Sequence, residues 1–422
     1  MLSSPGASPP PMMRQMPAGQ ILLTDDASAL AAAFNAGTLI RPTAGHLNLV
    51  DLSLAIAAAN GAGTPRDAGP RRLADAIGPN DHLIVVMADG MGMNVLGTLP
   101  RQGFLRRHLR MSIHTVFPSA SAVALTTLAT GEWPSRHAVT GWWTYVPELG
   151  LAGALLPFVM RDSRRSLAEL GADLGLLIHG RPLLDSSERD VLALHPKQFC
   201  DSPYSKFFSG QRRRAPYASL EHATRLLIAR LRDATGPTYT YLYNHRIDAL
   251  AHRYGAASPE VREAAADLDR ALGELYNATA GKARIVVTAD HGLLDAAEGS
   301  KHLIPPTDRL LDDLSAPPTG DSRVQYLHVK GGAEASVRER FGDLVERRFY
   351  VITFDEAHEL RLFGPGAYPG AARARIGDLI AISKGEDVVE YPGADGSGNM
   401  LAQIAHHSGL HPDEMLIPLI VA

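Results

Sequence analysis

Short, almost continuously apolar runs recur along the chain, and amphipathic segments separate them. The clearest runs cover residues 82–88, 112–117, 238–243, 283–289 and 415–422. Runs of this length without polar alternation are typical of strands that are buried on both faces of a parallel sheet. We therefore expect these runs to form parallel strands of one core sheet.

Helix signals lie between the apolar runs. Ser219 can cap a helix whose apolar positions fall on one face, and Ser258 is a second cap that is followed by Pro259 at the first helical position. Leucine, valine and alanine recur at helical spacing after both caps. The alternation of strand and helix predicts a doubly wound, mostly parallel α/β sheet.

Two segments interrupt this alternation. Residues 145–215 are rich in Pro, Ser and Arg and contain few clear strands, whereas residues 296–400 have a strand and helix pattern of their own. We expect a catalytic domain formed by residues 21–295 and 401–422, with residues 296–400 inserted as a small α+β cap. Residues 1–20 have a Pro-, Ser- and Gly-rich composition that predicts disorder.

Composition excludes several classes of partner. The net charge is −4, from 41 basic and 45 acidic residues, which argues against binding to a nucleic-acid polymer. No window is long and apolar enough to suggest a membrane span. Cys200 is the single cysteine, so no intrachain disulfide can form and a reducing, cytoplasmic location is expected. The oligomeric state does not follow from any of these features.

Residue types that carry chemistry follow the predicted strands, where open α/β sheets place their sites. In chain order these are Asp89, the serines Ser119 and Ser121, the pair Asp248 and His252, the pair Asp290 and His291, and finally His406 and His407. Each has a simpler interpretation taken alone: a turn aspartate, a helix cap, a surface ion pair. Their common position at strand ends favours a shared site.

The number and type of these side chains indicate metal binding. Three aspartates and three histidines, the last being His406 or His407, form a set of oxygen and nitrogen donors that suits zinc, with manganese or iron as alternatives. Six ligands divide into two sites of three or four. Two metals about 3.5–4 Å apart can stabilise the attacking and leaving oxygens of a phosphoryl transfer. One of the serines would then be a nucleophile.

The ordered motifs resemble those of the type I phosphodiesterase/nucleotide pyrophosphatase branch of the alkaline phosphatase superfamily. The resemblance covers about residues 82–292 and 400–422, through FPSAS, TLATG, DALAH, ADHG and HSG. It implies an alkaline phosphatase-like fold. It also implies that Ser121 is the nucleophile and that one metal is held by Asp89, Ser121, Asp290 and His291. The second metal is then held by Asp248, His252 and His407.

The resemblance implies a two-metal hydrolase of small-molecule phosphodiesters or pyrophosphates that acts through a phosphoserine. Ala124 stands where many nucleotide-cleaving members carry a phosphate-binding asparagine, and Ala122 stands where alkaline phosphatases carry an arginine. Without that arginine a monoester dianion lacks a bidentate partner, which favours diesters. A phosphonate hydrolase, a phosphomonoesterase and a non-catalytic metal-stabilised binding protein remain as alternatives. No motif identifies the substrate-binding residues.

Other polar and aromatic residues have weaker claims. We expect a solvated loop at Arg212–Arg214 and packing for the alternating Tyr239, Tyr241 and Tyr243. We also expect a surface position for His302, an unreactive Cys200, and a polar turn at residues 395–399. Trp142 and Trp143 could stack on a substrate or pack in the core.

Overall fold

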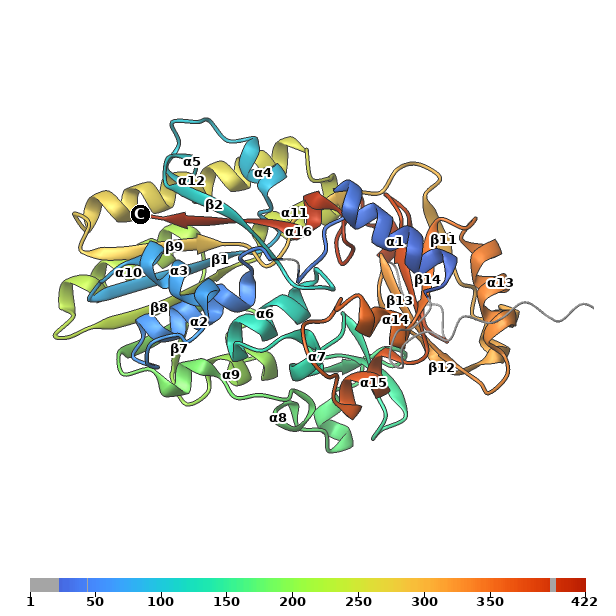
Figure 1. The fold of residues 1–422 in the computed structure, drawn as a ribbon. Coiled ribbons are helices and arrows are strands. Elements are labelled where there is room, and N and C mark those ends of the chain that lie inside the picture. Colours follow the sequence, from blue (N-terminus) through green and yellow to red (C-terminus); the bar gives the residue numbers. More distant parts are fainter. Residues whose placement is uncertain (1–22, 44, 395–399) are drawn as a thin grey trace, which may run out of the picture.

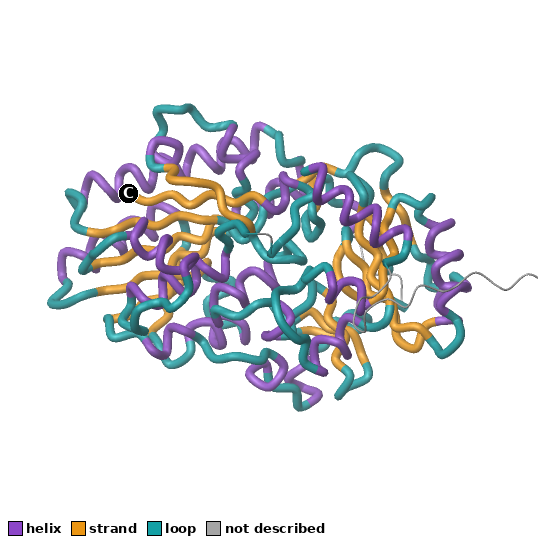
Figure 2. Tube along the Cα trace, in the orientation of Figure 1, coloured by secondary structure: helices purple, strands orange, loops and turns teal. Residues whose placement is uncertain are grey.

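The computed structural model describes residues 23–43, 45–394 and 400–422 (Figure 1). The expected disorder of residues 1–20 and the expected turn at 395–399 lie outside the described residues. The described chain forms two seven-stranded sheets that lie side by side along the long axis of the molecule (Figures 1 and 2).

The first sheet has the strand order β2-β18-β9-β1-β8-β6-β7. Its strands are β1 (His82–Ala88), β2 (Leu109–His114), β6 (Asp190–Pro196), β7 (Arg213–Tyr217), β8 (Thr238–Asn244), β9 (Ala283–Thr288) and β18 (Leu416–Val421). The five apolar runs therefore do form strands of one sheet, and β1 pairs in parallel with β8 and β9.

Two expectations about this sheet were wrong. The last strand, β18, runs antiparallel to both of its neighbours, because a continuous apolar run reports burial on both faces and not strand direction. The segment 145–215 contributes β6 and β7 to the sheet edge. The polar residues and Pro216 of β7 concealed this edge strand, since an edge position tolerates both.

Helices in two groups cover the two faces of the first sheet (Figure 1). One group contains α2 (Leu49–Ala59), α3 (Ala68–Ile77), α6 (Ser121–Thr130) and α9 (Pro203–Ser209). The other contains α4 (Met93–Gly97), α5 (Phe104–Arg107), α10 (Leu220–Asp233), α11 (Arg246–Tyr254) and α12 (Pro259–Ala278). Ser219 and Ser258 cap α10 and α12 through their side chains, as predicted. This is the doubly wound α/β architecture expected from the sequence.

The second sheet has the order β14-β15-β13-β12-β3-β4-β5. Its strands are β3 (Trp143–Val146), β4 (Leu151–Ala154), β5 (Val159–Met160), β12 (Leu314–Asp321), β13 (Val324–Val329), β14 (Phe349–Thr353) and β15 (Leu379–Ser383). One face packs on α1 (Asp25–Ala36), α14 (Phe354–Glu359) and α15 (Gly370–Ile376), and the other packs on α13 (Glu334–Leu344). Residues outside 296–400 thus also contribute to this layer, and the expected domain boundaries stay a prediction.

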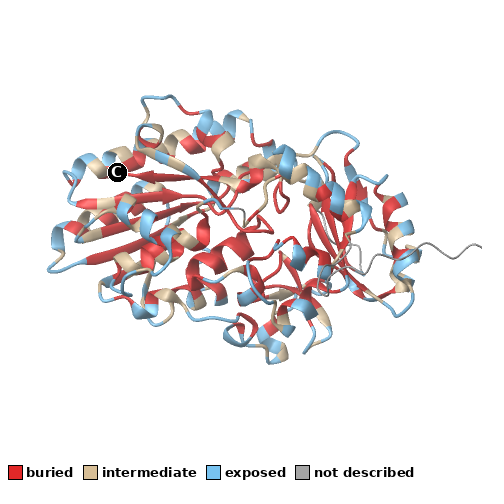
Figure 3. Ribbon diagram, viewed as in Figure 1, coloured by how far each residue is buried: buried red, intermediate tan, exposed pale blue. Residues whose placement is uncertain are grey.

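Short elements complete the described chain. They are α7 (Pro134–His137), α8 (Leu174–Leu177), α16 (Pro412–Met415), the strand pairs β10 (Leu294–Asp295) with β17 (Ala405–His406) and β11 (Lys301–Leu303) with β16 (Val388–Glu390), and the 3-10 turns at Leu167–Leu170, Leu183–Ser186, Arg309–Asp313 and Met400–Ala402. Every residue of α6 is buried, and this helix lies in the middle of the molecule, toward the second sheet (Figure 3). The carboxyl ends of the parallel strands of the first sheet therefore point into the interior of the molecule, toward α6 and the second sheet (Figure 1).

Candidate metal and catalytic site

Three adjacent strands carry most of the candidate residues. The order β9-β1-β8 places Asp290 and His291, Asp89, and Asp248 next to one another beyond the strand ends. The backbone fixes this arrangement: Asp248 N donates to Asp89 O at 3.2 Å, and Gly90 N donates to a carboxylate oxygen of Asp290 at 3.1 Å. Residues separated by up to two hundred positions in the sequence thus converge at one edge.

The motif glycines are required by close contacts between these strand ends. A Cβ atom on Gly90, which has a φ of +75°, would lie 3.0 Å from Cα of Asp248. A Cβ on Gly292 would lie 2.0 Å from the carbonyl oxygen of Asp413. At both positions the atom that the Cβ would meet at this distance belongs to the backbone of another segment of the chain.

The first cluster consists of Asp89, Asp290 and His291, whose ligand atoms all lie within 4.8 Å of one another. His291 Nε2 is 3.5 Å from a carboxylate oxygen of each aspartate. Ser121 Oγ lies 3.1 Å from the same nitrogen. We call Asp89, Asp290 and His291 the Asp89 triad.

Ser121 is the first residue of α6 and does not cap the helix. The N-cap position is Ala120, and no side chain caps this end. Ser119 has a different role: its Oγ donates to Gly409 O at 2.8 Å and accepts from Ser408 N at 3.2 Å. One serine therefore faces the Asp89 triad, and the other holds the loop that follows His407.

The second cluster, which we call the Asp248 triad, consists of Asp248, His252 and His407. His252 Nε2 lies 3.3 Å from Asp248 Oδ1. The ring of His407 stacks on that of His291, with centroids 3.8 Å apart, so the two triads adjoin. His406 lies outside the triad and contacts Ser322 Oγ through Nδ1 at 3.0 Å.

The two triads fit divalent cations. Four buried atoms of the triads have no hydrogen-bond partner among the described residues, namely Asp89 Oδ1, Asp290 Oδ2, Asp248 Oδ1 and His407 Nδ1. Each of the three carboxylate oxygens has only a histidine Nε2 nearby, at 3.3–3.5 Å. A buried carboxylate oxygen without a partner is costly unless a cation compensates it. Burial, followed by repulsion from Asp290 and Asp248, raises the pKa of Asp89 well above its usual range. Carboxylate and imidazole donors of this kind suit zinc and similar metals.

The Asp248 triad contains an internal ion pair. Burial favours a higher pKa for Asp248, but the imidazoles of His252, His407 and His291 outweigh it and lower this pKa below its usual range. The pKa of His252 rises to about 9, because attraction to Asp248 exceeds the effect of burial. Burial and the neighbouring His291 lower the pKa of His407. Asp248 is thus charged, and a cation that binds to this triad would replace the Nε2 proton of His252 as the positive partner of Asp248.

Several contacts to the triads were not expected from the sequence. Tyr243, which we had assigned to packing, donates its hydroxyl to Asp89 Oδ2. His252 Nδ1 faces Ala405 O at 2.8 Å, which orients the ring. Tyr243 lies near the end of the apolar run that forms β8, beside Met87 of β1. This position at a strand end was the signal that could have identified it as a contact of the site.

The second sheet contributes a carboxylate close to the triads. Asp321 ends β12 and is buried, and its Oδ2 has no hydrogen-bond partner among the described residues. Burial raises the pKa of Asp321 to about 6, although Ser322 N and the imidazoles of His252 and His291 oppose the shift. No sequence motif marked this residue.

The remaining candidates have structural partners. Arg212 donates to the carbonyls of Leu184, Asp185 and Ser187 instead of forming a solvated loop. His302 is buried and lies 3.1 Å from Asp387, so the expected surface position was wrong.

Trp143 is packed in the core beneath the guanidinium of Arg161, at 4.7 Å from the ring centroid. Cys200 is buried, and burial raises the pKa of its thiol.

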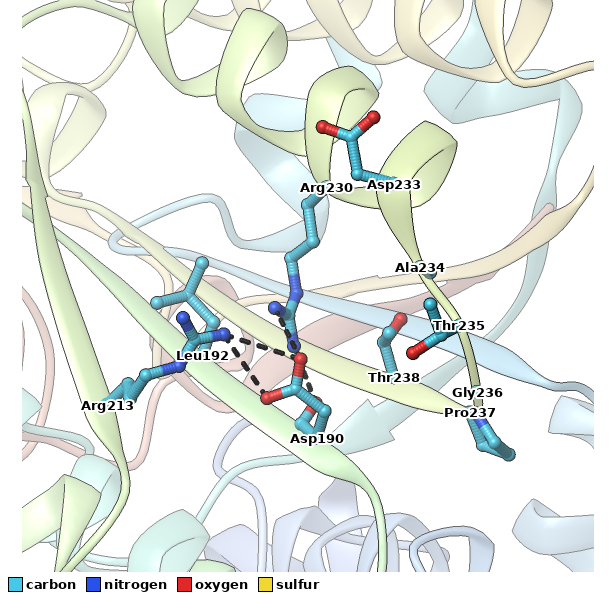
Figure 4. A pocket seen from close by; sticks show the side chains of 10 residues that line it. All are labelled: Asp190, Leu192, Arg213, Arg230, Asp233, Ala234, Thr235, Gly236, Pro237 and Thr238. Carbon is cyan, nitrogen blue, oxygen red and sulfur yellow. Dashed lines mark hydrogen bonds and ion pairs between the residues drawn. The ribbon is translucent and has the colours of Figure 1, made fainter.

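A pocket of about 530 Å³ lies at the opposite edge of the first sheet, near the amino ends of β6 and β8 (Figure 4). Its charges neutralise one another: Arg230 and Arg213 both point to Asp190, at 2.9 and 3.2 Å. This pocket is therefore separate from the triads and offers no free charge at Asp190.

The fold and family comparison identify the class of protein as a phosphoester hydrolase of the alkaline phosphatase superfamily. The family model described as type I phosphodiesterase / nucleotide pyrophosphatase matches residues 83–400, and the chain belongs to this family. The resemblance seen in the motifs is thereby confirmed. A search of curated protein sequences gave no match.

Solved structures share the fold at low sequence identity. Murine ectonucleotide pyrophosphatase / phosphodiesterase 5 is 17% identical, with a TM-score of 0.59 over 80% of this chain and 87% of its own. An inactive variant of that protein in complex with AMP aligns equally well. Phosphonoacetate hydrolase from Sinorhizobium meliloti 1021, in complex with phosphonoformate, is 19% identical with a TM-score of 0.57 over 80% and 89%. Within the described residues, no helix combines the length and apolar character needed to cross a bilayer.

Proposed function

We propose that the protein is a two-metal hydrolase of small phosphodiesters or pyrophosphates that forms a phosphoserine at Ser121. The observation that carries this proposal is the position of Ser121 Oγ, 3.1 Å from His291 Nε2 and beside two adjoining carboxylate–imidazole triads. A lone helix-capping serine would need neither triad.

The residues that would hold the cations follow from the two triads. Asp89, Asp290 and His291, together with Ser121 Oγ, would hold one, and Asp248, His252 and His407 would hold the other. When bound, two such cations would lower the pKa of the serine hydroxyl and neutralise charge on the phosphoryl group. Zinc suits these donors best, with manganese and iron as alternatives.

The residues of the chain perform the remaining tasks. Ser121 Oγ forms a bond to phosphorus as the bond from phosphorus to the leaving oxygen breaks, and the hydroxyl proton passes to solvent. Water then cleaves the phosphoserine and restores the hydroxyl. A phosphoryl group on Ser121 would lie at the buried start of α6, where a helix N-terminus favours negative charge. Positioning and charge neutralisation supply most of the rate.

The substrate preference rests on two alanines beside the nucleophile. Ala122 and Ala124 are fully buried and offer no side-chain donor. A phosphate monoester would lack a bidentate partner for its second charge there, which favours diesters and pyrophosphates. The fold shared with phosphonoacetate hydrolase keeps a phosphonate hydrolase as the second candidate.

The single cysteine supports a reducing, cytoplasmic location.

A substrate screen and one substitution test the proposal. Bis-p-nitrophenyl phosphate, dinucleotides, phosphonoacetate and a monoester are offered to protein of measured metal content. We expect the diesters to be hydrolysed fastest, and Ser121→Ala to abolish turnover while the metal content stays near normal. Full activity of Ser121→Ala would refute the covalent route. Bound metal without hydrolysis of any phosphoester would favour a non-catalytic binding protein.

A further inference from the structure

The turn between β12 and β13 is buried against the loop that carries His407. Its residues Asp321, Ser322 and Arg323 are all buried, although turns normally lie at the surface. The turn belongs to the second sheet, whereas His407 directly follows β17, on the segment that leads through α16 to the last strand of the first sheet. This contact therefore joins the two layers beside the Asp248 triad.

Arg323 forms a fully buried ion pair with Glu414. Nε and Oε1 lie 2.8 Å apart, and both side chains are at most 1% exposed. The two carboxylate oxygens of Glu414 also accept from Gly409 N at 2.8 Å and from His411 N at 3.2 Å. The ion pair thus holds the backbone immediately after His407.

Two further contacts from the turn fall on the direct neighbours of His407. Ser322 Oγ lies 3.0 Å from Nδ1 of His406, and Arg323 N donates to Ser408 Oγ at 3.2 Å. The turn therefore contacts the residues before and after the ligand histidine and leaves its ring free to face Asp248.

The backbone at Ser408 and Gly409 has a conformation that permits this contact. A Cβ on Gly409 would lie 2.7 Å from one carboxylate oxygen of Glu414 and 3.0 Å from Nε of Arg323. Ser408 has a φ of +95°, which costs energy for a residue with a side chain. The glycine of the HSG motif is thus required by the ion pair.

We infer that Ser322, Arg323 and Glu414 are positioning residues that fix His407 for cation binding by the Asp248 triad. This inference rests on the proposed two-metal function. A buried ion pair adds little net stability over a well-packed apolar pair, so we attribute this pair to the geometry that it imposes on the loop. Residues that orient a metal ligand typically change metal affinity about 10–100-fold when removed.

The test is a competition titration of the full-length protein with Zn²⁺ against a chromogenic chelator. Wild type is expected to bind two Zn²⁺ per chain. Arg323→Met should bind the first with unchanged affinity and the second about 10–100-fold more weakly. The double variant Arg323→Met/Glu414→Gln removes the unpaired charge and should regain stability without regaining the second Zn²⁺.

Control variants separate positioning from general destabilisation. Arg338→Met disrupts an ion pair of the same atom types, Nε to Oε1 of Glu334 at 2.9 Å, on α13 in the same layer, and should leave both affinities unchanged. Ser322→Ala removes one neutral contact and should weaken only the second Zn²⁺ about 10-fold, which keeps the test decisive if Arg323→Met does not fold. If the folded double variant or Ser322→Ala binds the second Zn²⁺ with wild-type affinity, the positioning role is refuted and the proposed function is not. A wild type that binds fewer than two Zn²⁺ overturns the proposed function as well.

Discussion

Tyr243 connects the strand β8 to a residue that follows β1. Its hydroxyl donates to Asp89, and burial followed by the charge of Asp89 raises the pKa of Tyr243 well above its usual range. The tyrosine thus stays protonated and holds one carboxylate oxygen, while the other, Oδ1, has no hydrogen-bond partner among the described residues and lies 3.5 Å from His291 Nε2. This division leaves Oδ1 available to a cation.

Replacing Tyr243 with phenylalanine should weaken cation binding by the Asp89 triad. We expect about a 10-fold lower Zn²⁺ affinity and a comparable fall in kcat, because the carboxylate loses its orienting donor. Metal titration and steady-state kinetics measure both effects. Tyr241→Phe is the matched control, since Tyr241 lies two residues earlier on β8 and packs its ring against Phe208. Equal effects of the two substitutions would show that Tyr243 contributes only packing.

The sequence identified the candidate metal ligands better than the residues that orient them. Asp89, Asp248 and Asp290 could be predicted as neighbours because each follows an apolar run, and parallel strands end at the same edge. Tyr243 and Arg323 could not, since their partners lie far away in the sequence and tyrosine and arginine have many ordinary uses. Their roles depend on contacts that only the folded chain creates.

At the scale of an element, the helix α6 fixes the position of Ser121, the proposed nucleophile. All its residues are buried, and Thr127 Oγ1 lies 3.1 Å from Nε2 of His137, at the end of α7. Nδ1 of His137 accepts from Val139 N at 3.1 Å, so the ring is held in its neutral form. Burial, followed by repulsion from Arg375 and His179, lowers the pKa of His137 to about 3.

This buried imidazole makes stability fall in acid. Below the ordinary pKa of 6.5 the unfolded chain binds a proton at His137 that the folded chain excludes down to about pH 3, so the free energy of unfolding decreases as the pH falls through this window. Between about pH 7 and about pH 5 the loss at this group should be about 2 kcal/mol. Urea unfolding of wild type and His137→Asn at both pH values isolates the contribution of His137, because the other histidines contribute equally to both proteins. An identical pH dependence of the two proteins would contradict the assignment.

Element directions were harder to predict than element positions. The runs that became β1, β8 and β9 were correctly placed and are parallel. The equally apolar β18 is antiparallel, because burial on both faces produces the same pattern in either direction. The edge strand β7 was missed because an edge position accepts polar residues and proline.

At the scale of the whole molecule, the second sheet joins segments that lie far apart in the sequence. β3 pairs with β12 across more than one hundred and seventy positions, and α1 packs beside β14. Such pairing leaves no local signature in the sequence, so the contribution of residues 143–160 could not be read from their pattern. The consequence for function is that the second sheet places Asp321 and Arg323 beside residues of the first.

The central claim is that two cations bind side by side next to one serine hydroxyl. Anomalous X-ray diffraction from crystals grown with Zn²⁺ tests it most directly. The account predicts two peaks about 3.5–4 Å apart, one against the Asp89 triad and Ser121 Oγ and the other against the Asp248 triad. Crystals in which both triads are free of metal, or in which a single peak lies away from the Ser121 hydroxyl, would contradict it.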